Sequence, residues 1–142
     1  MKCFWLLNHT PSPLQIDELV NRFGISDIVF PSQTFAAVWS ELPPGDVLYP
    51  DLVDSWIDSI SAPDIAIVQG DSTYTFYIVD ALLEKGVRVF AATTERVVKE
   101  TTHGDKVNIS RIFMHKAFRE YRRRESKNIS TGGNLCNILN HI

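Results

Sequence analysis

The fold of this chain is decided by one stretch, Ile65-Ala66-Ile67-Val68-Gln69-Gly70-Asp71-Ser72-Thr73-Tyr74. Four apolar residues lead into a polar turn at Gly70, and a helical apolar pattern then runs from Tyr74 to Leu83. This order predicts a buried strand that turns into a helix. Such a turn directs backbone N–H groups and the positive end of a helix at one point, which suits a phosphate or another anion.

Two further strand ends carry polar turns of the same kind. Asn8-His9-Thr10 follows the apolar run 4–7, and Thr93-Thr94-Glu95-Arg96 follows the apolar run 87–92. Strands that alternate with helices predict an α/β fold, a Rossmann-like doubly wound, mostly parallel sheet with helices on both faces. Loops at the carboxyl ends of parallel strands share one rim, so these polar residues are expected to converge on one site.

Capping signals divide the first 92 residues into elements. Strands are expected at 2–8, 27–30, 64–69 and 87–92, and helices at about 13–23, 33–42, 50–60 and 74–85. Ser12 and Gln15 form a capping-box pattern with Pro13 at the first helical position, and Gly24 ends that helix. Ser32 is expected to cap the second helix.

The pattern is weaker after Arg96. Residues 97–102 fit one helical turn, 103–105 a turn, and 107–113 a strand at the edge of the sheet, while 117–124 fits either a strand or a helix. We divide the chain into a Rossmann-like domain, residues 1–121, and a basic C-terminal tail, residues 122–142, whose order the sequence leaves open.

Composition narrows the function classes. The 142 residues are 44% apolar, as in one globular domain. No apolar run approaches the roughly 20 residues of a membrane span, so no membrane partner is expected. Cys3 and Cys136 form no metal-binding or redox motif, and they favour a reducing cytoplasm. Without an HExxH motif or another ligand spacing, neither a metal nor a cofactor is expected.

Charge is distributed unevenly along the chain. Residues 1–98 contain 5 basic and 13 acidic side chains, a net charge of −8, and residues 99–142 contain 9 basic and 4 acidic ones, a net charge of +5. The basic part suits either attraction of a polyanion or an ordinary solvated surface.

Each polar turn supplies candidates for chemistry. An imidazole can take up or release a proton near neutral pH, so His9 suits proton transfer, with Asn8 and Thr10 as ligand donors. The alternative is a histidine bonded to the loop backbone, and the position of His9 at the rim favours the functional interpretation. In the second turn Asp71 fits a helix N-cap, and no GxGxxG or Walker pattern is present. Arg96 could grip a phosphate, or it could form a surface ion pair. The backbone N–H of Gly70 and the hydroxyls of Ser72 and Thr73 are candidate ligand donors in the second turn.

Several short motifs together resemble a known family. They are residues 6–11 (LLNHTP), 38–44 (VWSELPP), 68–74 (VQGDSTY), 92–96 (ATTER) and 113–121 (FMHKAFREY). Their order and spacing resemble those of the CRISPR-associated Rossmann-fold ring nucleases of type III systems, specifically the Csx-twenty group. The resemblance spans residues 1–121.

This resemblance implies a cytoplasmic homodimer that cleaves cyclic tetra-adenylate, a cyclic oligoadenylate second messenger of antiviral defence. A ribose 2′-hydroxyl attacks the neighbouring phosphate without a metal, and His9 and Arg96 are implied as catalytic residues. The residues implied to hold riboses and bases are Gln69, Gly70, Asp71, Ser72, Thr73 and Thr94, with His115 and Arg119 as weaker candidates. Duplex nucleic acid is not implied as a partner. Two alternatives remain open: a non-catalytic sensor or sponge for a cyclic nucleotide, and an unrelated nucleotide or sugar-phosphate enzyme.

Overall fold

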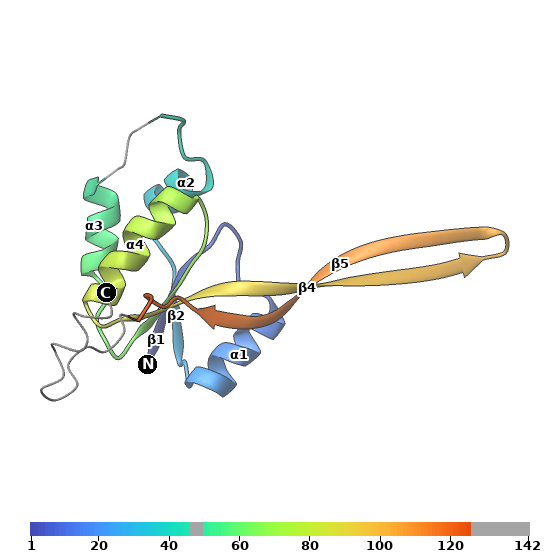
Figure 1. The fold of residues 1–142 in the computed structure, drawn as a ribbon, viewed down its shortest axis with the longest axis horizontal. Helices are drawn as coiled ribbons and strands as arrows, with labels where there is room; N and C mark the ends of the chain where they lie inside the picture. The colour runs from blue at the N-terminus through green and yellow to red at the C-terminus, as the bar shows by residue number, and fades with distance from the viewer. Residues whose placement is uncertain (46–49, 126–142) are drawn as a thin grey trace, which may run out of the picture.

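The computed structural model describes residues 1–45 and 50–125. Its centre is one sheet of five strands in the order β2-β1-β3-β4-β5, seen in Figure 1. Neighbouring strands pair in parallel through β4, and β5 pairs antiparallel with β4. The strands are β1 (Lys2–Leu6), β2 (Asp27–Val29), β3 (Ile65–Val68), β4 (Arg88–His103) and β5 (Lys106–Glu120).

Local capping chemistry sets the limits of the helices, which are α1 (Pro13–Phe23), α2 (Gln33–Ser40), α3 (Pro50–Asp58) and α4 (Ser72–Glu84). The capping box of Ser12 and Gln15 is confirmed, and Gly24 ends α1 with a left-handed φ of 68°. The hydroxyl of Ser32 accepts a hydrogen bond from the Phe35 backbone, as expected of the α2 cap.

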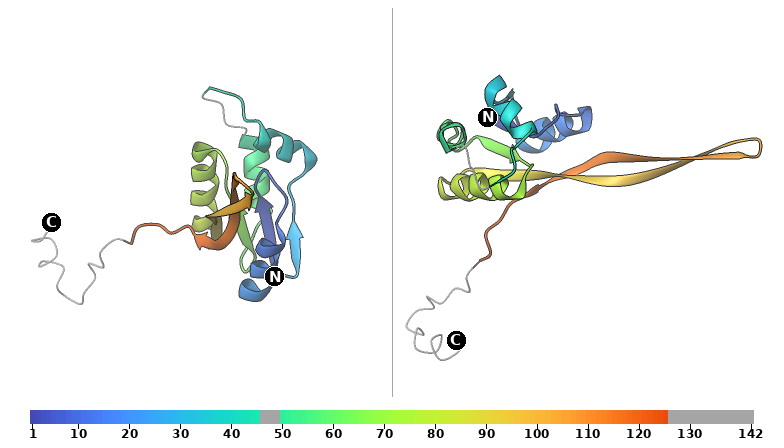
Figure 2. Two further views of the ribbon diagram at one scale, coloured as in Figure 1. Left: turned by 90° about the vertical axis from the view of Figure 1, so that its right-hand side faces the viewer. Right: turned by 90° about the horizontal axis from the view of Figure 1, so that it is seen from above.

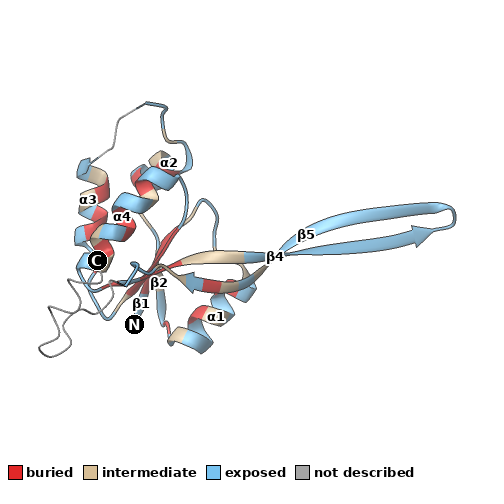
Figure 3. Ribbon diagram, in the orientation of Figure 1, coloured by how far each residue is buried: buried red, intermediate tan, exposed pale blue. Residues whose placement is uncertain are grey.

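Side chains of the central strands alternate between two hydrophobic clusters, one on each face of the sheet. Phe4 and Leu6 of β1 pack with the apolar sides of α2, α3 and α4. Cys3 and Trp5 point to the opposite face, where Leu19 of α1 covers them. In Figure 3 the buried colour gathers on the central strands and on parts of the helices that surround them. Helices therefore cover both faces, and among the helices of residues 1–45 and 50–125, α1 alone covers the second.

The prediction of a Rossmann-like doubly wound fold is wrong. After β4 the chain does not cross back through a helix to a further parallel strand. It turns at Gly104-Asp105 and returns as β5, antiparallel to β4, so the sheet is mixed. Gly104 has a φ of 60°, which a two-residue hairpin turn requires and which glycine adopts at little cost.

The outer parts of β4 and β5 form a long ribbon that leaves the body of the molecule, as Figures 1 and 2 show. We call residues 94–115 the arm. The helical turn expected at 97–102 is wrong because this segment is part of β4. The turn at 103–105 and the edge strand at 107–113 are confirmed. The strand alternative for 117–124 holds as far as Glu120.

A β-bulge marks the base of the arm. Thr93 pairs with Ala117 and Thr94 with His115, so Lys116 is an extra residue in β5. The bulge resets the alternation of side chains, and His115 and Phe118 therefore face the same side of the sheet, with ring centroids 4.6 Å apart.

The described residues include no helix long and apolar enough to cross a membrane. Of the basic tail, residues 122–125 are described and have no regular secondary structure. Cys136 and the expected tail residues 126–142 lie outside the described part.

Candidate functional site

The carboxyl ends of β1 and β3 meet the middle of β4 at one rim of the sheet, as expected for parallel neighbours. A cavity of about 370 Å³ opens there, lined by Leu7, Asn8, His9, Gln15, Gln69, Gly70, Ala92 and Thr94. A second cavity of about 440 Å³ shares His9, Gln15 and Thr94 and continues along the base of the arm to Phe113, Met114 and His115. The structure thus brings together residues of all three predicted segments. The turn expected at Thr93-Thr94-Glu95-Arg96 is wrong, however, because these residues are part of β4.

His9 is exposed at this rim, and a hydrogen bond from Trp5 of β1 holds its loop in place. Trp5 donates an indole hydrogen bond to the His9 carbonyl at 2.7 Å. His9 Nδ1 lies 2.8 Å from the Thr10 carbonyl oxygen. Since a carbonyl only accepts, Nδ1 carries the proton, and the lone pair of a neutral ring is on Nε2. His9 is therefore bonded to the loop backbone, as one alternative held, and it also presents a basic nitrogen.

Gln69 joins three strands at the floor of the site. Its backbone N–H donates to the Leu6 carbonyl at 3.1 Å, and its side-chain oxygen accepts from the Ala92 backbone at 3.0 Å. Its carbonyl accepts from the Trp39 indole at 3.2 Å. These contacts fix the Gln69 side chain and leave its amide nitrogen as the group that can contact a ligand.

Gly70 is a glycine because of Trp39. A Cβ at position 70 would lie 2.6–2.9 Å from three atoms of the Trp39 indole, too close for any side chain. Trp39 is buried at 3% exposure, which fits a packing role. The close approach leaves the backbone of Gly70 open to the cavity.

The polar side chains of Asp71 and Thr73, which follow Gly70, are used mainly to cap the start of α4. The Asp71 carboxylate caps α4 by accepting from the backbone of Thr73 and Tyr74 and from the Thr73 hydroxyl. The Thr73 hydroxyl bond, with those backbone bonds, lowers the pKa of Asp71. The N-cap interpretation of Asp71 is therefore confirmed. Ser72 lines a different cavity, together with Gly70 and Tyr121.

Arg96 lies just outside the cavities. Alternate residues of a strand share a face, so the Arg96 side chain is on the same face of β4 as Thr94, which lines the cavities together with His9. Its guanidinium lies 5.6 Å from the centroid of the Phe113 ring. Within the described chain, the lining of the two cavities includes Thr94 and Phe113 but not Arg96. Arg96 therefore reaches a ligand only if that ligand extends onto the arm.

His115 is brought into the second cavity but is held by a carboxylate. Its Nε2 lies 2.7 Å from Glu18 Oε1, and its side chain is 4% exposed. Glu18 also accepts from Arg22 and from the Phe118 backbone. Burial opposes ionisation of Glu18, but the bonds from Arg22, His115 and Phe118 outweigh it and lower the pKa of Glu18. His115 is therefore tied to α1 and is poorly placed to move a proton.

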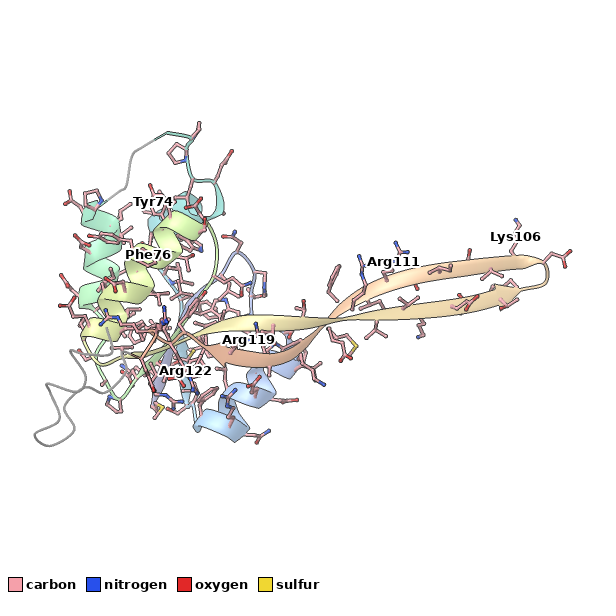
Figure 4. All side chains as sticks on the ribbon, in the orientation of Figure 1. Tyr74, Phe76, Lys106, Arg111, Arg119 and Arg122 are labelled. Atoms are coloured by element: carbon pink, nitrogen blue, oxygen red, sulfur yellow. The ribbon has the colours of Figure 1, made fainter. Side chains whose placement is uncertain are left out.

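Arg119 is not brought to the His9 cavities. It is exposed, and its position next to buried Phe118 puts it on the other face of the sheet from His115. Figure 4 shows Arg119 near the base of the ribbon. Of the following basic residues, Arg123 bonds the Asp80 carboxylate and carbonyl on α4.

Two residues of the site were not predicted, Gln15 and Glu18. Gln15 lines both cavities and is 4% exposed, with its side-chain oxygen accepting from the Ser12 backbone. The capping box is a sequence signal that aims Gln15 at the helix start. Glu18 contacts His115 across 97 positions, and no local pattern gives this pairing.

Within the described ranges, no three His, Cys, Asp or Glu side chains gather where they could hold a metal ion. Cys3 is a buried free thiol, and burial raises its pKa to about 12. It is therefore a core residue and a poor nucleophile.

Comparison with known proteins gives a family. A curated relative, "Uncharacterized protein MJ1673" of Methanocaldococcus jannaschii, is 26% identical over 128 residues, which cover 84% of this chain and 96% of the relative. No solved structure matches the chain. The profile of the family described as "Uncharacterized protein MJ1673 family" matches residues 1–119, which include the His9 cavities and the arm. The chain belongs to the MJ1673 family.

Proposed function

We propose that this protein is a ring nuclease that cleaves cyclic tetra-adenylate and so switches off type III CRISPR antiviral signalling. One observation carries the proposal: His9 presents a basic Nε2 in a cavity that it shares with Asn8, Gln69, Gly70 and Thr94. Exposed amide, hydroxyl and backbone N–H groups around an imidazole suit a ribose phosphate.

The proposed reaction needs no metal and no cofactor. His9 Nε2 takes the proton of a ribose 2′-hydroxyl, and the 2′-oxygen attacks the adjacent phosphorus. The bond from phosphorus to the 5′-oxygen breaks, and that oxygen takes a proton from the His9 imidazolium. The products are a 2′,3′-cyclic phosphate and a free 5′-hydroxyl. Arg96 stabilises charge on the phosphate when the ring extends onto the arm.

The protein would act in the cytoplasm as a homodimer. A ring of four identical nucleotides has two-fold symmetry, so two copies of one rim can each meet the same half of the ring. Neither duplex nucleic acid nor a membrane is part of the proposal.

A non-catalytic sensor or sponge is the alternative. It is favoured by the position of Arg96, the only catalytic cation expected, beyond the lining of the described cavities. Incubation of the full chain with cyclic tetra-adenylate, with and without a chelator, followed by chromatography, tests both. Cleavage in chelator supports the nuclease. Binding without cleavage identifies the sensor, and the absence of both rejects the ring as ligand.

A further inference from the structure

The arm projects into solvent without support from the body. Every residue from Glu95 to Met114 is exposed, and Figure 3 shows the outer ribbon in the exposed colour throughout. A two-stranded hairpin is at best marginally stable alone in water. A ribbon of this length therefore points to a surface that packs on it.

The two faces of the arm differ. The face that continues from Thr94 and His115 we call the α1-side face, because α1 covers the same side of the sheet at its base. It carries the four most exposed apolar side chains of the arm: Phe113 at 66%, Ile109 at 62%, Val98 at 58% and Val107 at 52%. The other face has Lys99, Thr101, Asn108 and Ser110 along its outer half. The other face also carries exposed apolar side chains near its base, at Val97, Ile112 and Met114. Only the α1-side face has an apolar side chain in every cross-strand pair from base to tip, so it is the face better suited to burial.

Charges on the α1-side face indicate what packs there. Along the arm this face presents cross-strand pairs in the order Arg96/Phe113, Val98/Arg111, Glu100/Ile109 and Thr102/Val107. Arg111 and Glu100 lie in adjacent pairs. Figure 4 shows the Arg111 side chain reaching out from the ribbon. A cation and an anion on either side of one midpoint form a self-complementary pattern.

We infer that a second copy of this chain packs its arm antiparallel on the α1-side face, with the two-fold axis between the Arg111 and Glu100 pairs. Each Phe113 then lies over the partner's Val107, and each Arg111 lies over the partner's Ile109, diagonally beside the partner's Glu100. In a parallel arrangement Arg111 would lie over the partner's Val98, diagonally beside the partner's Arg111, so that like charges would be neighbours. Charge complementarity therefore selects the antiparallel one.

The antiparallel register also brings the tip of one arm to the body of the other copy. Counting outward from the axis, the partner's Gly104-Asp105 turn lies over Thr94 and His115, at the mouth of the second cavity. The face of the arm is only about 33 Å long and two strands wide, too small alone for the roughly 800 Å² per partner of a stable interface. Contact of the tip with the body supplies further area. The pairing of the arms does not rest on the proposed function.

Sedimentation equilibrium of the full chain tests the pairing. The wild type is expected to be a dimer, and Glu100→Arg and Arg111→Glu are each expected to weaken it at least tenfold. Mixing the two variants is expected to restore a dimer, now a heterodimer of the two chains. At one of its two contacts the two introduced charges are neighbours and have opposite signs. At the other contact the native Arg111 of one chain is beside the native Glu100 of the other. Lys99→Glu, on the other face, is the control and stays dimeric.

A monomeric wild type overturns the inference, as does a dimer that neither reversal weakens. A chain that carries both Glu100→Arg and Arg111→Glu is the further comparison. If this double variant dimerises but the mixture of single variants does not, the two charges pair within one arm, and the assignment to a second copy is wrong. A dimer that follows the charge pattern but leaves cyclic tetra-adenylate intact contradicts the proposed function and supports the pairing.

Discussion

The imidazole of His115 on β5 and the carboxylate of Glu18 on α1 lie 2.7 Å apart, although 97 positions separate them in the sequence. Glu18 also accepts from the backbone N–H of Phe118 at 3.0 Å. The two contacts join α1 to β5 on either side of the β-bulge. They hold the base of the arm against the helix whose start lines the His9 cavity.

Glu18 is expected to make stability depend on pH. Its pKa is lowered in the folded protein, so its contribution is full above the unfolded pKa and is lost as the pH falls through the folded pKa. Glu18→Gln should remove this pH-dependent contribution. Below a pH of about 4.3, the free energy of unfolding of the variant should therefore fall less than that of the wild type.

Glu18→Ala should cost about 1.5–3 kcal/mol at neutral pH, because it leaves the buried bonding groups of His115 and Phe118 without an acceptor. Asp17→Ala, an exposed neighbour on α1, is the control. Urea unfolding across pH measures both effects. Equal pH profiles for the wild type and Glu18→Gln would show that the Glu18 charge does not stabilise the fold.

Gly70→Ala should destabilise the protein by about 1–3 kcal/mol through its clash with the Trp39 indole. The cost should shrink in a Trp39→Leu background, since the atoms that the new Cβ meets are then absent. A double-mutant cycle of thermal unfolding measures the coupling. Additive effects would mean that the indole is not what excludes a side chain at position 70.

Local signals predicted much of the first 90 residues. Ser12 with Gln15, Gly24, Ser32 and Asp71 cap helices as expected, because a cap is decided within one turn of chain. The convergence of Asn8, Gln69 and Thr94 followed from one rule about parallel strands.

The arm could not be predicted in the same way. Residues 97–102 mix β-branched and charged side chains, with Val97 and Val98 in succession, so they lack the hydrophobic alternation that marks a half-buried strand. The pairing of β4 with β5 and the contact of Glu18 with His115 are long-range. The doubly wound prediction was wrong because it assumed that the chain after β4 would continue the earlier strand–helix alternation.

His9→Ala should lower the rate of ring cleavage by roughly 10²–10⁴-fold while changing the dissociation constant of the ring little, because Nε2 acts as the base. Single-turnover kinetics and binding to the intact ring separate the two effects. Asn21→Ala, at an exposed position of α1, serves as the control. Cleavage at the wild-type rate would make His9 a structural loop residue.

Arg96→Ala should weaken ring binding and lower the cleavage rate roughly 10²–10³-fold, the effect of removing one group that stabilises a developing charge. Arg96→Lys should restore binding better than rate, because lysine cannot bond two phosphate oxygens at once. Lys99→Ala removes a cation from the other face of β4 and should change neither quantity. Unaltered binding and cleavage in Arg96→Ala would exclude this guanidinium from the site.

The central claim is that the chain opens the ring by attack of a ribose 2′-hydroxyl, without water as the nucleophile. The most direct test is mass spectrometry of products formed from cyclic tetra-adenylate in ¹⁸O-labelled water with a chelator present. We expect first products that end in a 2′,3′-cyclic phosphate and contain no ¹⁸O, since the cleavage step consumes no water. First products that carry ¹⁸O on phosphorus, or a ring that remains intact, would contradict the account.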